Sequence, residues 1–66
     1  MRGKVKWFDA KKGYGFIKSD DGKDVFLHFS SLKMDGFKTV EEGDNVEFNL
    51  IDTDKGAKAE NVIKVT

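Results

Sequence analysis

Two short segments in the first half of the chain carry aromatic side chains at every second position. Tyr14 and Phe16 flank a glycine, and Phe26 and His28 flank a leucine. Because successive residues of a β-strand point to opposite faces, each pair would lie on one face of a sheet. Exposed rings in such an arrangement can stack on nucleobases, and each stacked base contributes about 1–3 kcal/mol. These residues therefore indicate binding of bases rather than a reaction.

Basic residues are concentrated around the first of these segments. Residues 1–18 carry six Lys or Arg against one acid, a net charge of +5, whereas residues 19–66 carry six Lys and eleven Asp or Glu, a net charge of −5. Lysines at the rim of an aromatic surface can neutralise phosphates, and a positive segment in so small a domain creates a local field. On charge alone, a solvated strand face with scattered lysines explains the same distribution equally well.

Length and composition exclude several classes of protein. With 66 residues there is room for one domain over residues 1–66, whose core supplies only about 3–5 kcal/mol. There is no cysteine and one histidine, so we expect no disulfide, no metal and no cofactor. No apolar run reaches the roughly 18 residues of a membrane span, and the first residues lack the apolar core of a signal peptide. We expect a soluble, cytoplasmic monomer with no membrane partner.

The sequence also argues against an enzyme. Its carboxylates are numerous, but none is recognisably isolated in an apolar setting that would tune it as an acid or base. His28 has no serine or cysteine nucleophile in a motif context. We therefore expect binding without turnover.

Turn signals divide the chain into five candidate strands. Asp21-Gly22 is typical of a tight hairpin, and residues 30–43 form a longer connection in which Ser30 and Ser31 could cap one short helical turn. Five short antiparallel strands in 66 residues indicate an all-β fold, a small closed or nearly closed barrel. The predicted strands are residues 3–8, 14–19, 24–29, 45–52 and 58–65.

Strand alternation separates two kinds of hydrophobic residue. One face of the predicted strands carries the side chains that suit the barrel interior: Ile17, Val25, Leu27, Val46, Phe48 and Leu50. The opposite face carries Tyr14, Phe16, Phe26 and His28, which would then point outward. A barrel this small is filled from one face only, so the outward rings form an exposed patch of the kind that marks a binding surface.

Strand alternation alone does not place four further aromatic residues. Simple alternation would bury Trp7 with Val5, so a bulge near Lys6 is needed to bring the tryptophan to the outer face. Phe8 and Phe29 could each be half-buried. Phe37, in the long connection, is equally consistent with a loop anchor and with a stacking ring.

The two aromatic segments resemble a pair of known motifs. Residues 12–17, Lys-Gly-Tyr-Gly-Phe-Ile, resemble the first ribonucleoprotein motif, and residues 25–29, Val-Phe-Leu-His-Phe, resemble the second. With Gly-Lys-Val-Lys-Trp-Phe at residues 3–8 and Glu-Gly at residues 42–43, essentially the whole chain resembles a bacterial cold-shock protein. The resemblance implies a five-stranded antiparallel OB-fold barrel. It also implies binding of single-stranded RNA and DNA, with a preference for pyrimidine-rich strands and with RNA-chaperone and antitermination roles.

The resemblance assigns roles to particular residues. It places base stacking at Trp7, Phe16, Phe26, His28, Phe29 and Phe37, with Tyr14 at a position where the family has Phe or Tyr. It implies a partial contact for Phe8, basic contacts for Lys6, Lys12 and Lys55, and a hydrogen bond to a base edge for Asp24. The chain departs from the family after Gly56, where Ala57 and Lys58 stand in place of the frequent Pro and Gln.

A second class of function stays open at this point. The same barrel architecture hosts oligosaccharide-binding and protein-binding modules, and aromatic rings also stack on sugars. Sugar sites would favour carboxylates and amides beside the rings, whereas this sequence places Lys6 and Lys12 there.

Overall fold

The computed structural model of the chain describes residues 1–33 and 40–65. All five predicted strands are confirmed, with small differences at their ends. Phe37 lies outside the described residues, so its predicted role stays a prediction. The elements are β1 (Arg2–Asp9), β2 (Tyr14–Ser19), β3 (Asp24–His28), the 3-10 turn η1 (Phe29–Ser31), β4 (Asn45–Thr53) and β5 (Gly56–Lys64).

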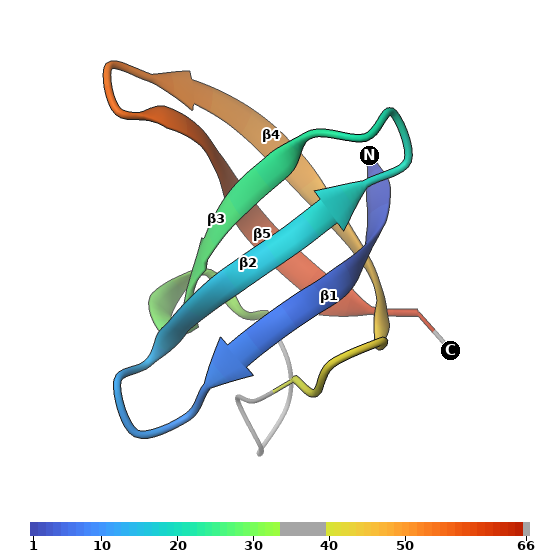
Figure 1. Cartoon of the computed structure of the whole chain (residues 1–66), viewed down its shortest axis with the longest axis vertical. Coiled ribbons are helices and arrows are strands. Elements are labelled where there is room, and N and C mark those ends of the chain that lie inside the picture. The colour runs from blue at the N-terminus through green and yellow to red at the C-terminus, as the bar shows by residue number, and fades with distance from the viewer. Residues whose placement is uncertain (34–39, 66) are drawn as a thin grey trace.

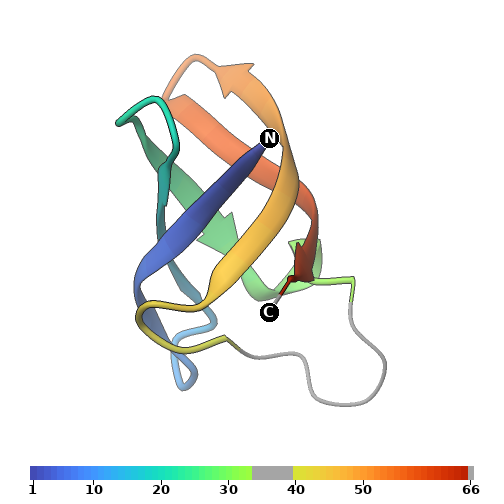
Figure 2. The same cartoon turned by 90° about the vertical axis from the view of Figure 1, so that its right-hand side faces the viewer.

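The strands close into a barrel in the order β1-β2-β3-β5-β4 (Figures 1 and 2). Four of the pairings are antiparallel, as predicted, but β3 and β5 pair in parallel, with Phe26 opposite Lys58. Parallel neighbours cannot be joined by a tight turn. In the sequence, β3 and β5 are separated by the long connection, by β4 and by the turn that follows β4. The barrel is therefore mostly antiparallel, with one parallel contact that completes the closure.

The predicted bulge in β1 is confirmed. Val5 pairs with Ile17, and the register then shifts so that Trp7 pairs with Phe16. Lys6 is the extra residue, and it turns Trp7 to the outer face of the barrel. The strands approach closely beyond the bulge, because a Cβ on Gly15 would lie 2.2 Å from the Trp7 carbonyl oxygen. Only glycine fits at this position.

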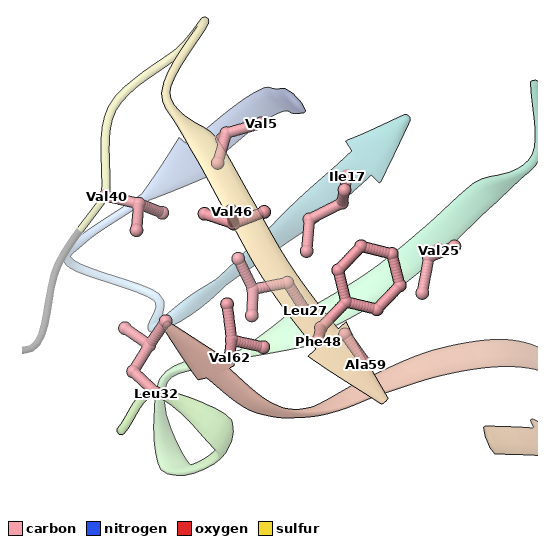
Figure 3. Packing of buried hydrophobic residues seen from close by; sticks show 10 residues of the cluster. All are labelled: Val5, Ile17, Val25, Leu27, Leu32, Val40, Val46, Phe48, Ala59 and Val62. Atoms are coloured by element: carbon pink, nitrogen blue, oxygen red, sulfur yellow. The ribbon is translucent and has the colours of Figure 1, made fainter. Parts of the chain in front are cut away.

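The barrel interior is filled by aliphatic side chains and one phenylalanine (Figure 3). Of the six residues predicted to lie inside, five are at most 2% exposed, whereas Leu50 is only partly buried and packs against this cluster. Ser19 is the buried polar residue among those described. The buried hydrophobic residues are Val5, Ile17, Val25, Leu27, Leu32, Val40, Val46, Phe48, Ala59 and Val62.

The connection after β3 begins with the 3-10 turn η1. The predicted short helical turn is confirmed, but its N-cap is His28, and Ser30 and Ser31 lie within it. Leu32 then enters the core and bridges to Val62 of β5. Across the described part of the chain, no helix has the length and apolar character needed to cross a membrane.

Candidate nucleic-acid interface

Four aromatic rings gather on the outer face of β1, β2 and β3. Ring centroids are 5.6 Å apart for Trp7 and Phe16, 5.7 Å for Phe16 and Phe26, 6.0 Å for Phe26 and Tyr14, and 5.8 Å for Tyr14 and Trp7. Each ring thus contacts two others, mostly in tilted or edge-to-face geometry, which is the favoured arrangement for aromatic pairs. Trp7 is 39% exposed and the other three are half-buried. We call these four residues the aromatic quartet.

A second pair of rings continues this surface along β3 into η1. His28 lies opposite Tyr14 in the β2–β3 ladder, and its ring centroid is 4.8 Å from that of Phe29. Phe29 is 47% exposed and lies directly over Gly13, where a Cβ would be 2.8 Å from its ring. The glycine therefore makes room for the ring. The aromatic quartet, His28 and Phe29 together are called the platform.

The ring of His28 is held by its neighbour Ser30. The backbone N–H of Ser30 donates to Nδ1 of His28 at 3.2 Å, and the Ser30 hydroxyl oxygen lies 2.8 Å from the same nitrogen. Because Nδ1 accepts a hydrogen bond, the neutral ring carries its proton on Nε2. His28 therefore offers a hydrogen-bond donor at Nε2.

One hollow lies beside Phe29 at the end of the platform. It has a volume of about 310 Å³ and is lined by Phe8, Ala10, Lys11, Lys12, Gly13 and Phe29. The Asp9 carboxylate fixes the turn that carries the lysines, accepting from the backbone N–H groups of Lys11 at 2.9 Å and Lys12 at 3.1 Å. This first hollow combines two rings with two ammonium groups.

A second hollow lies between the rings of Phe16 and Phe26 and the turn that joins β4 to β5. It has a volume of about 540 Å³ and is lined by Phe16, Asp24, Phe26, Thr53, Lys55, Gly56, Ala57 and Lys58. Asp24 is paired there with Lys6, whose Nζ is 3.5 Å from Oδ2 of the carboxylate. Both side chains are about half exposed, and exposed pairs contribute only about 0–1 kcal/mol. A ligand can therefore replace either partner.

The structure brings most of the predicted site residues to one surface. The quartet and the His28–Phe29 pair form its centre, Phe8 and Lys12 line the first hollow, and Asp24 and Lys55 line the second, with Lys6 bound to Asp24. Only Phe37 cannot be placed, because it lies outside the described residues.

Three polar residues that line the two hollows were missed by sequence reasoning. Lys11 and Thr53 lie in turns next to residues that were selected. Lys58 reaches the second hollow because β5 runs parallel to β3 and places it opposite Phe26. Turn signals between consecutive strands do not predict this parallel pairing. Lys58 was noted in the sequence only because it replaces the glutamine that is frequent in the family.

A closed five-stranded barrel with the strand order β1-β2-β3-β5-β4 defines the OB-fold class, and here one face of it carries exposed rings with flanking lysines. The chain matches the family described as 'Cold-shock' DNA-binding domain over residues 1–65. It is 54% identical over 65 residues to cold shock-like protein CspC of Bacillus cereus, covering 98% of this chain and 100% of that protein. It is 60% identical over 62 residues to a cold shock-like protein of Thermotoga maritima, covering 94% of each. The chain therefore belongs to the cold-shock domain family, a family of nucleic-acid-binding proteins.

Comparison of solved structures supports the same fold. Drosophila Unr CSD456 is similar with a TM-score of 0.81 over 98% of this chain, at 20% sequence identity. This chain spans 26% of that larger chain, so the likeness concerns the barrel alone.

Proposed function

We propose that the protein binds single-stranded RNA and DNA by stacking bases on the platform while its lysines contact phosphates. The observation that carries this proposal is the exposure of six neighbouring rings on one face of a barrel whose interior is already filled. Large exposed apolar patches on small proteins usually mark binding surfaces. The protein acts as a monomer in the cytoplasm, prefers pyrimidine-rich strands and works by binding without turnover.

The geometry of the platform favours single strands over duplexes. A duplex hides the faces of its bases, whereas a single strand can splay them onto aromatic rings. Stacking is tolerant of sequence because every base has a flat face. A protein that takes up unpaired bases in this way keeps its partner unstructured, which is the physical basis for the RNA-chaperone and antitermination roles that we assign to it.

The residues around the platform favour nucleic acid over oligosaccharide. The two hollows beside it are lined by four lysines and one carboxylate. A sugar site would favour carboxylates and amides beside the rings, whereas phosphates attract ammonium groups. Asp24 is the exception, and its carboxylate can accept a hydrogen bond from a base once Lys6 moves to a phosphate.

Alanine substitution of platform rings tests the proposal. Phe16→Ala and Phe26→Ala should each weaken binding of a single-stranded oligonucleotide by about 1–3 kcal/mol, because each removes a stacking partner. Ile63→Ala is a matched control, because Ile63 is an exposed apolar residue on β5 outside the platform. Calorimetric titration gives the affinities and thermal melting confirms the fold. Unchanged affinity in both phenylalanine variants would contradict the proposal.

A hairpin RNA with a fluorophore and a quencher at its ends tests the chaperone role. Binding to unpaired bases should open the hairpin and raise the fluorescence in proportion to protein added. The Phe26→Ala variant should open it less at equal concentration. If the protein binds the single strand but leaves the hairpin closed, the chaperone role is wrong and only the binding of single strands stands.

A further inference from the structure

We propose that Lys58 leads the bound strand off the platform into a separate polar hollow, which holds its sugar–phosphate backbone. This inference rests on the proposed function, since it extends the path of the same strand. The hollow has a volume of about 300 Å³ and lies between β5 and the turn η1. Its lining residues are Ser30, Ser31, Lys33, Lys58, Glu60 and Asn61.

Lys58 connects the two regions. It lines both this polar hollow and the hollow beside Phe16 and Phe26. It is also the residue of β5 directly opposite Phe26 in the parallel pairing that closes the barrel. A strand that leaves the Phe26 ring toward β5 therefore meets the Lys58 ammonium group first and the polar hollow next.

The chemistry of the polar hollow fits a backbone rather than a base. Among the residues that the structure describes, its lining includes no aromatic or aliphatic side chain, so these residues provide no surface for stacking. It provides instead two ammonium groups, two hydroxyls and an amide. These are the groups that contact phosphate and sugar oxygens in protein–nucleic acid complexes. Phosphates positioned here would be contacted independently of the base sequence.

The walls of the polar hollow are built from paired backbone. Leu32, next to η1, bridges to Val62, and the backbone N–H of Lys33 donates to the Val62 carbonyl oxygen at 2.7 Å. Because Leu32 and Val62 are also fully buried, η1 and β5 are fixed relative to each other. The hollow is thus preformed, which reduces the entropy lost on binding.

One carboxylate shares the hollow with its two lysines. Oε2 of Glu60 lies 3.3 Å from Nζ of Lys58, and both side chains are 44% exposed. An exposed pair of this kind contributes about 0–1 kcal/mol, so a phosphate can displace the carboxylate at small cost. Within the part of the chain that the structure describes, Lys33 makes no ion pair. The Glu60 carboxylate therefore pairs with Lys58 until a phosphate of the bound strand takes its place.

The test measures the salt dependence of binding for single-lysine variants. The probe is a single-stranded oligothymidine of about 12 nucleotides, within the range of site sizes for one OB-fold. Each phosphate contact to a single strand contributes about 0.7 to the slope of log K against log salt. Lys58→Gln and Lys33→Gln should each lower the slope by about 0.7, and an oligocytidine of the same length should show the same loss.

Matched controls separate this proposal from general charge effects. Lys64 is also on β5 and also ion-paired, with Asp44 at 3.3 Å, but it lies at the far end of the strand. Lys64→Gln should leave the slope unchanged. Glu60→Gln should tighten binding, because the phosphate no longer competes with a carboxylate. Thermal melting of every variant confirms that the barrel is folded.

The outcomes distinguish the new inference from the proposed function. An unchanged slope in either Lys58→Gln or Lys33→Gln, while Phe26→Ala still weakens binding, would overturn the path into the polar hollow and leave the platform intact. A slope lowered equally by Lys64→Gln would also overturn it, because the effect would then reflect net charge. If neither Phe16→Ala nor Phe26→Ala weakens binding, the proposed function itself is wrong.

Discussion

His28 shows how a single residue on the platform is prepared for its role by a local contact. Its Nδ1 accepts from the Ser30 backbone at 3.2 Å and lies 2.8 Å from the Ser30 hydroxyl oxygen, so the ring cannot rotate freely. A fixed ring loses less side-chain entropy when a base stacks on it. The same contact determines which nitrogen faces a ligand as a donor.

Nitrogen NMR of the imidazole tests this at the residue scale. In the neutral form of the ring we expect the Nε2–H tautomer to dominate, because Nδ1 is an acceptor. Ser30→Ala keeps the backbone donor but removes the hydroxyl, so the tautomer should persist with a weaker preference. A dominant Nδ1–H signal in the unaltered protein would contradict the assignment.

The bulge in β1 is the element-scale feature on which the platform depends. It moves Trp7 from the predicted interior parity to a direct pairing with Phe16. The close approach beyond it requires Gly15, because a side chain there would meet the backbone of both Trp7 and Phe8. The position of the rings therefore depends on Gly15, a buried residue that has no side chain.

Gly15→Ala tests this dependence. The added methyl would lie 2.2 Å from the Trp7 carbonyl oxygen, so β1 must shift away from β2. Overpacking of this kind costs about 1–3 kcal/mol, and the shift should also alter Trp7 fluorescence. Lys18→Ala, on an outward position of the same strand, is the control. Equal thermal stability of the two variants would show that the strands are not constrained here.

The β2–β3 hairpin contains an ionisable group, Asp21, whose pKa is clearly shifted. The Ser19 hydroxyl donates to the Asp21 carboxylate and accepts from the Lys23 backbone at 3.1 Å. The hydrogen bond from Ser19 lowers the pKa of Asp21 below its ordinary value of 3.8. Because the folded-state pKa is depressed, the stabilisation is present above pH 3.8 and is lost as the pH falls through the folded-state pKa.

Carboxyl NMR titration of Asp21 checks this shift. The midpoint should lie below 3.8 in the unaltered protein and move up toward 3.8 in Ser19→Ala, which removes the donor. An Asp21 midpoint that is the same in both proteins would show that the Ser19 contact does not control its ionisation.

Local patterns predicted most of the elements, the ring-bearing face and a closed barrel, but not the parallel pairing of β3 with β5 that closes it. Alternation along each strand was sufficient to separate Ile17 from Phe16, and the parity of Trp7 was sufficient to require a bulge. The parallel pairing of Phe26 with Lys58 depends on strands far apart in sequence, and no local pattern encodes it. For the same reason Lys58 was missed. Separately, Leu50 was expected to be more buried than it is.

At the scale of the whole molecule, charge is distributed unevenly although the total is zero. The segment with a net charge of +5, residues 1–18, provides β1, the following turn and all of β2 except Ser19, and it carries three of the six platform residues. The acids lie mainly in the remainder of the chain. We therefore expect the long-range attraction of a polyanion to be weak and stacking to provide much of the binding free energy.

The salt dependence of binding by the unaltered protein tests this balance. If two to four phosphates are neutralised, log K should fall with log salt with a slope of about 1.4–2.8. Fluorescence titrations at several salt concentrations provide the slope. A much steeper slope would mean that electrostatic attraction dominates and that stacking has a minor role.

The central claim is that the exposed rings bind unpaired bases, and Trp7 reports on it directly. It is the single tryptophan of the chain and part of the aromatic quartet, so its fluorescence has one origin. Titration with a thymine-rich single strand of about seven nucleotides, within the span of one OB-fold, should quench it strongly and saturably. The matching duplex should have little effect. No quenching by the single strand, with no competition by RNA, would contradict the account and favour a sugar or a protein as the ligand of the platform.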